Sequence, residues 1–89
     1  MSELTDSLIE YPCDFPIKVF GQSQLGFAKA VMEVVLRHDP GFQPGTIQMR
    51  SSSQARYTCL TCTVRATSRE QLDALYQELC DHPMVVKVL

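Results

Sequence analysis

Two cysteines three positions apart, Cys59 and Cys62, have the spacing in this sequence that most suggests chemistry. In a redox or zinc site the two sulfur atoms must converge, which a turn or the start of a helix allows. Here the pair lies inside a stretch with the alternating pattern of a β-strand, where residues three apart point to opposite faces. We therefore expect Cys62 in the core, Cys59 on the opposite face of the sheet, and neither in a metal or redox site.

The other cysteines and the two histidines show no catalytic or metal-binding pattern. Cys13 and Cys80 lie in distant segments, and the sequence has no second Cys-x-x-Cys and no His-x-x-x-His motif. His38 falls in the last turn of an expected helix, where positive charge suits the helix dipole, and His82 precedes a proline in a loop. No segment combines a nucleophile, a base and an acid. We expect no enzyme, no bound metal and no cofactor.

The segment that joins the first expected strand to the first expected helix could hold a small ligand. Two glycines, a hydroxyl and side-chain amides at a helix N-terminus can bind a small anion or an amino acid. The segment matches neither a P-loop nor the Gly-x-Gly-x-x-Gly fingerprint, and a plain strand end with a helix cap is the alternative interpretation. The candidate ligand-binding residues are Gly21, Gln22, Ser23, Gln24 and Gly26.

Length and composition indicate one small domain. The chain has 89 residues, 45% of them hydrophobic, and a net charge of -2. No apolar run approaches the ~20 residues of a membrane span, and the N-terminus does not resemble a secretory signal. We expect a soluble cytoplasmic protein with reduced cysteines. Residues 1–14 form an acidic N-terminal arm without Lys or Arg, and residues 15–89 form a single domain that carries all eight basic residues.

Apolar periodicity predicts the element order β-α-β-β-α-β. Strands are expected at 15–21, 46–51, 57–66 and 84–89. The first helix, over 24–37, is expected to have Ser23 as its N-cap. The second helix follows a cap at Thr67 or Ser68 and stops at 81–83. The expected apolar stripes are Ala28, Val31, Met32 and Val35 in the first helix and Leu72, Leu75, Tyr76 and Leu79 in the second.

This order predicts a ferredoxin-like α+β sandwich. Both helices must cover the same sheet face to bury their stripes, and right-handed crossovers then give an antiparallel sheet in the order 4-1-3-2. The other face is expected to be open. One basic residue per strand points outward from it, and the expected strands contain no Asp or Glu. The candidate partner-binding residues on this face are Lys18, Phe20, Arg50, Tyr57, Arg65 and Lys87.

Two other interpretations of that face are open. Solvent-exposed strand positions favour Thr, Lys and Arg in any sheet, so the cations could be ordinary surface residues. RNA-recognition domains have the same element order and stack bases on aromatic residues of their central strands. Here the third strand has one aromatic residue, Tyr57, and no glycine. With a net charge of -2, nucleic-acid binding is therefore expected to be weak.

Short stretches along the chain also suggest a family. They are Phe15-Pro16, Lys18-Val19, Gly21-Gln22, Val34-Val35, Arg37-His38, Pro40-Gly41, Ser52-Ser53 before Tyr57, Ala66-Thr67, residues 75–79 and Val88-Leu89. Together, and in this order, they make the chain from Ile9 to Leu89 resemble the YbeD-like family of small bacterial proteins of unknown function. The resemblance implies a ferredoxin-like fold similar to ACT-type regulatory domains. Such domains often hold an amino acid near the first strand–helix loop, which corresponds by position to Gly21–Gly26.

We therefore expect a non-enzymatic cytoplasmic module that binds a regulatory small ligand or a protein partner. The alternatives are weak binding of nucleic acid or an acidic partner by the open face, and a module that serves mainly for oligomerisation. Four cations on one face would oppose face-to-face pairing of two copies. We therefore expect a monomer or an edge-mediated dimer.

Overall fold

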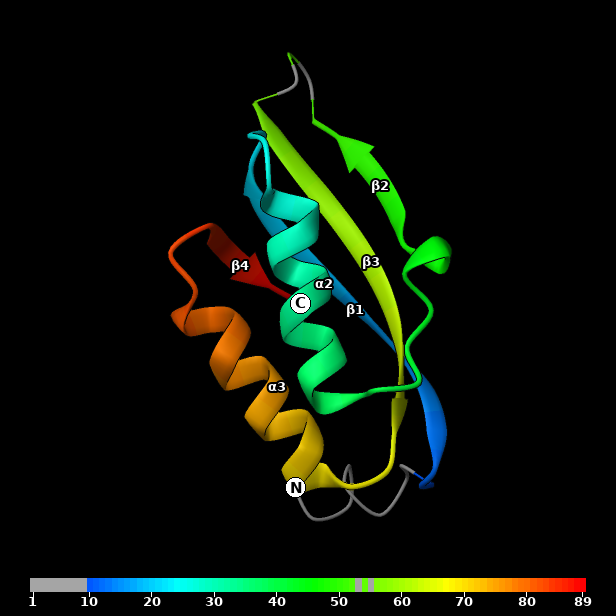
Figure 1. The fold of residues 1–89 in the computed structure, drawn as a ribbon. Helices are drawn as coiled ribbons and strands as arrows, with labels where there is room; N and C mark the ends of the chain where they lie inside the picture. The colour runs from blue at the N-terminus through cyan, green and yellow to red at the C-terminus, as the bar shows by residue number, and fades with distance from the viewer. Residues whose placement is uncertain (1–9, 53, 55) are drawn as a thin grey trace.

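The two helices lie side by side on one face of a four-stranded antiparallel sheet (Figure 1). The computed structural model describes residues 10–52, 54 and 56–89. The strands lie in the order β2-β3-β1-β4, which confirms the predicted fold class and topology. The elements are β1 (Cys13–Gln22), α2 (Phe27–His38), the 3-10 helix η1 (Pro44–Thr46), β2 (Gln48–Ser51), β3 (Tyr57–Ala66), α3 (Arg69–Asp81) and β4 (Val85–Val88).

The two long central strands, β1 and β3, set the register of the sheet. They pair antiparallel over ten positions, from Cys13 opposite Ala66 to Gln22 opposite Tyr57. Their buried residues alternate with exposed ones, because successive side chains of a strand point to opposite faces. The edge strands β2 and β4 have four residues each. Below, the sheet face opposite the helices is called the open face.

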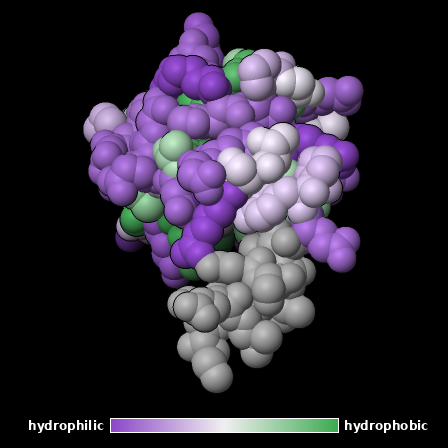
Figure 2. Space-filling view, turned by 90° about the horizontal axis from the view of Figure 1, so that it is seen from below, coloured by the Kyte–Doolittle hydropathy of each residue, from purple (hydrophilic) through white to green (hydrophobic). Residues whose placement is uncertain are grey.

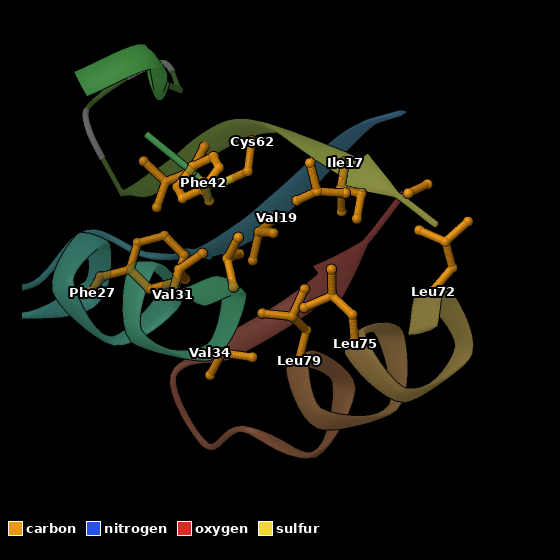
Figure 3. Close-up of a cluster of buried hydrophobic side chains, with 14 residues drawn as sticks. Ile17, Val19, Phe27, Val31, Val34, Phe42, Cys62, Leu72, Leu75 and Leu79 are labelled. Atoms are coloured by element: carbon orange, nitrogen blue, oxygen red, sulfur yellow. The ribbon is translucent and has the colours of Figure 1, made fainter. Parts of the chain in front are cut away.

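The core lies between the sheet and the helices (Figure 3). The sheet supplies Ile17 and Val19 from β1 and Leu60, Cys62 and Val64 from β3, all fully buried. From α3, the predicted stripe packs on them, with Tyr76 half-buried. Its fully or nearly fully buried members are Leu72, Leu75 and Leu79. Within the described residues, no helix is both long enough and apolar enough to cross a membrane.

The N-terminus of α2 differs from the prediction. Ser23 is not its N-cap. The cap is Gly26, which has a left-handed backbone (φ 86°) and offers no side chain for capping. Glycine adopts this conformation without steric cost, so the chain can turn sharply before the helix. The turn places Phe27, the first residue of α2, in the core.

The buried stripe of α2 is correspondingly rotated. Phe27 and Val34 are buried with Val31 and Val35, whereas the predicted Ala28 and Met32 are only half-buried. In Figure 1 α2 lies across the central strands, and β2 forms the edge of the sheet next to β3. The space between α2 and β2 is an apolar groove of about 410 Å³. It is lined by Ala28, Lys29, Met32, Pro44, Ile47 and Met49.

The first strand begins two residues before the expected position. Asp14 therefore belongs to β1, and the expectation that the strands contain no acidic residue is wrong. Asp14 lies opposite Arg65 of β3, and the two side chains form an ion pair of 3.4 Å. The cross-strand attraction explains how an acid is tolerated there. Glu3 and Asp6 of the acidic arm lie outside the described residues, whereas Glu10 is exposed.

Gln71, in the first turn of α3, joins three elements. Its Nε2 donates to the carbonyl oxygens of His38 (2.8 Å) and Arg65 (3.1 Å), and its Oε1 accepts from the backbone N–H of Thr67 (2.6 Å). Ser68 is the N-cap of α3, and its hydroxyl accepts from the N–H of Gln71. The capping interaction predicted from sequence therefore also ties the ends of α2 and β3 to the start of α3.

Candidate functional site

The β1–α2 loop, the first candidate site, lies beside the start of β3. Its residues 22–26 are exposed, and Leu25 is fully so. Ser23 is held in place by two hydrogen bonds. Its N–H donates to the carbonyl oxygen of Arg56 (2.9 Å), and its hydroxyl is hydrogen-bonded to the hydroxyl of Thr58 (2.7 Å). A polar depression of about 350 Å³, here called the loop hollow, lies between Gln22, Ser23, Arg56 and Tyr57.

The loop hollow contains a cation that sequence reasoning did not assign to it. Arg56 lies 33 positions from Ser23 in the sequence, so the pairing of β1 with β3 alone brings it there. Gln24 and Gly26 are not among the lining residues. Gly21 is buried, and a Cβ atom there would lie 2.4 Å from the ring of Phe27. The two glycines of the loop are thus explained by packing and by backbone conformation.

The second candidate site, the open face, has the predicted arrangement of cations. Lys18, Arg50, Arg65 and Lys87 come from four different strands, and the register and alternation place all of them on this face. Within the described strands Asp14 is the one acidic residue, and it pairs with Arg65. Lys18, Arg50 and Lys87 have no carboxylate partner among the described residues.

Two aromatic residues accompany these cations. Phe20 is half-buried, and the Nζ of Lys87 lies 5.8 Å from its ring centroid, within cation–π range. Tyr57 is 45% exposed and lines a small hollow of about 140 Å³ together with Phe20 and Arg50. Tyr57 also lines the loop hollow. The two sites predicted separately from sequence are therefore neighbours, joined at Tyr57.

The cysteines lie on opposite faces, as expected. Cys62 is fully buried against the helices, and Cys59 is half-buried on the open face. Burial, with a smaller contribution from Cys59, raises the pKa of the Cys62 thiol to about 11. A thiol with a raised pKa is a poor nucleophile, because the thiolate is the reactive form. In the part of the chain that is described, no three His, Cys, Asp or Glu residues converge as metal ligands would.

This burial predicts a pH dependence of stability. The unfolded thiol ionises at lower pH than the folded one, so the stabilisation from Cys62 is complete below about pH 9 and is lost as the pH rises to about 11. We expect the free energy of unfolding, measured with urea, to fall over this interval. Cys62→Val should abolish that part of the decline, and Cys80→Ser, at an exposed position, should leave it. An unchanged decline in Cys62→Val would contradict the assignment.

Both histidines make hydrogen bonds that connect secondary-structure elements or stabilise a turn. Nε2 of His38 lies 2.7 Å from Oε1 of Glu78, whose other oxygen pairs with Arg37, so the end of α2 is tied to α3. Nδ1 of His82 accepts from the N–H of Met84 (3.1 Å) in the turn before β4. His82 is half-buried in this turn. Neither histidine is among the residues that line the hollows at the two candidate sites.

Comparison with known proteins places the chain in a family. A family model described as "Protein of unknown function (DUF493)" matches residues 6–89. A UPF0250 protein of Nitrosomonas europaea is 56% identical over 84 residues, which are 94% of this chain and 97% of the relative. A UPF0250 protein of Bordetella pertussis is 60% identical, over 94% of this chain and 92% of its own.

Two solved structures have the same fold at low sequence identity. A protein from H. pylori, solved in solution, superposes with a TM-score of 0.74 at 16% identity, covering 91% of this chain and 85% of its own. The ACT domain from the GTP pyrophosphokinase of Chlorobium tepidum gives 0.66 at 18% identity, over 85% and 84%. The chain thus has an ACT-like, ferredoxin-like fold, and it belongs to the DUF493/UPF0250 family, the YbeD-like proteins of unknown function.

Proposed function

We propose that this protein is a non-enzymatic regulatory module that binds an acidic segment of a partner protein on its open face. The observation that carries the proposal is the set of three cations, Lys18, Arg50 and Lys87, that share this face without carboxylate partners among the described residues. Unpaired cations on one face produce a positive potential that attracts an acidic surface and raises its rate of association.

The shape of the face supports a protein partner over a nucleic acid. Phe20 is half-buried beneath Lys87 and is therefore only partly available for stacking. Among the described residues, Tyr57 is then the one well-exposed ring of the face. Binding of single strands needs several stacking rings along a basic groove. A cationic surface with one exposed tyrosine and half-buried Thr61 at its centre instead has a charge that an acidic protein segment complements.

The ACT-like fold supports a regulatory role. The structural neighbour from Chlorobium tepidum is an ACT domain taken from a GTP pyrophosphokinase, so a module of this shape occurs within a larger enzyme. A separate chain of the same shape would have to reach its target by association. The helices cover one face of the sheet and leave the open face free for this purpose (Figure 1).

Reversing two open-face charges is expected to abolish partner binding. A photoreactive residue at Thr61, in the middle of the face, should cross-link to a partner protein in cells. Lys18→Glu/Lys87→Glu should lower that yield about tenfold or more, because each reversal turns an attraction into a repulsion. Lys29→Glu/Arg69→Glu, with the same change in net charge on the helix side, should leave the yield unchanged. Equal losses in both variants, or cross-links only to nucleic acid, would contradict the proposal.

The loop hollow favours a second function, binding of a small carboxylate or other anion beside Arg56. Its polar lining and the tethered Ser23 are the observations in its favour. A ligand at 100 times its dissociation constant should stabilise the protein by about 2.7 kcal/mol. In a thermal-shift screen of small metabolites we expect a hit whose effect Arg56→Ala removes and Arg37→Ala, a cation remote from this loop, does not. A broad screen without such a hit would contradict this function.

A further inference from the structure

A third hollow lies at the opposite end of the sheet from the loop hollow. It measures about 540 Å³ and is bounded by the end of β3, the start of β1 and the chain that follows α2. Viewed from below, this end of the molecule is largely hydrophilic (Figure 2). Its lining includes Asp14, Asp39, Phe42, Gln43, Thr63 and Arg65. We call it the Asp39 hollow.

Asp39 is the unusual member of this lining because it is a buried carboxylate, only 8% exposed. Its Oδ2 accepts from the backbone N–H of Arg65 at 2.9 Å. The short strand β2 explains this bond: β2 pairs with residues 58–61 of β3, so it does not reach Arg65, and Asp39 satisfies that N–H instead. One oxygen of the carboxylate thus has a structural role.

The second oxygen, Oδ1, has no such role. No donor among the described residues bonds it, and no described cation lies within ion-pair distance of the carboxylate. The guanidinium of Arg65 pairs with Asp14 on the rim instead. No fully buried polar atom of the described side chains is without a partner, so the unbonded Oδ1 is still open to solvent, and Asp39 lines the hollow. Oδ1 lies 3.7 Å from the position that a Cβ atom of Gly41 would take, and Gly41 also lines the hollow.

A carboxylate oxygen bonds a charged donor more strongly than a neutral one, and Oδ1 of the largely buried Asp39 bonds no donor among the described residues. We propose that the Asp39 hollow binds a small molecule through a primary ammonium group, which donates to Oδ1 of Asp39. The volume suits a small organic ligand, and Phe42 offers apolar surface for its carbon chain. A divalent metal fits less well, since it needs about six oxygen ligands and no three His, Cys, Asp or Glu residues converge in the described part of the chain.

The test is a titration of the full-length, ¹⁵N-labelled protein with 1,5-diaminopentane at pH 7 and constant ionic strength. Saturable shifts are expected at the amides of Arg65, Gly41 and Phe42. Glutarate, of similar length and opposite charge, should not cause them. The same shifts with sodium chloride alone would overturn the proposal, as would magnesium or calcium acting at lower concentration than the diamine.

Variants locate the site. Asp39→Asn keeps an acceptor for the Arg65 N–H but removes the charge, so the dissociation constant should rise about tenfold or more. Glu33→Gln, which removes the same charge from the exposed surface of α2, should change it less than about twofold. Thr63→Lys places a cation at the mouth of the hollow and leaves Asp39 intact, so it should abolish binding even if Asp39→Asn fails to fold. Unchanged binding in Thr63→Lys would refute the proposal.

Discussion

Replacing Gly21 with alanine is expected to lower the free energy of unfolding by about 3 kcal/mol. The new Cβ would lie 2.4 Å from Cε1 of Phe27 and 2.5 Å from the backbone oxygen of Met84. Neither neighbour can move freely, because the Phe27 ring is buried in the core and the Met84 oxygen belongs to the backbone before β4. Urea unfolding followed by circular dichroism measures the change.

Gly45→Ala is the matched control. A Cβ at Gly45 meets nothing within 4 Å, so this variant should unfold within about 0.5 kcal/mol of the wild type. Phe27→Leu in the Gly21→Ala background should recover part of the loss, because it removes the ring but not the contact with Met84. If Gly21→Ala is as stable as Gly45→Ala, then β1, α2 and the turn before β4 do not approach as closely as described.

Replacing Leu75 with alanine is expected to cost about 3 kcal/mol by a different mechanism. Leu75 is fully buried in the centre of the α3 stripe, between the helix and the sheet (Figure 3). The substitution removes buried methyl groups and leaves a cavity that a close-packed core fills only in part. The midpoint of urea unfolding should fall, and the slope of the transition should stay the same.

Leu25→Ala makes the same chemical change at a fully exposed position. It should alter the free energy of unfolding by less than about 0.5 kcal/mol. Comparable losses in Leu75→Ala and Leu25→Ala would show that α3 is not packed on the sheet as described. Leu25 also lies in the β1–α2 loop, so Leu25→Ala provides a stable background for ligand screens at the loop hollow.

Local patterns predicted the elements and the faces of the strands. Alternation with a period of two places Lys18 and Arg65 on one face and Ile17 and Val64 on the other, because side chains alternate along any strand. The same rule places Cys59 and Cys62 on opposite faces, so this pair cannot bind one metal ion together. The cations of the open face were therefore readable from the sequence, although the ion pair between Arg65 and Asp14 was not, since it depends on where β1 begins.

The start of α2 shows where local patterns are insufficient. Ser23 is a good cap by residue type, but its hydroxyl bonds Thr58 and its N–H bonds Arg56, both distant in sequence. The helix starts at Phe27 instead, and its buried stripe shifts with it. Competition between a local cap and a long-range hydrogen bond is decided by packing.

The sequence by itself thus determined the class of fold, the order of the strands and the sign of the open face, since these follow from periodicity, chain handedness and residue charge. The tertiary structure alone decided what meets at each site. Pairing of β1 with β3 brings Arg56 to Ser23 and joins the two predicted sites at Tyr57. Because β2 is too short to reach Arg65, the Arg65 N–H donates to the largely buried Asp39 instead. From the sequence, Asp39-Pro40-Gly41 could be recognised only as the end of a helix. Such contacts join residues far apart in the chain, and no local pattern encodes them.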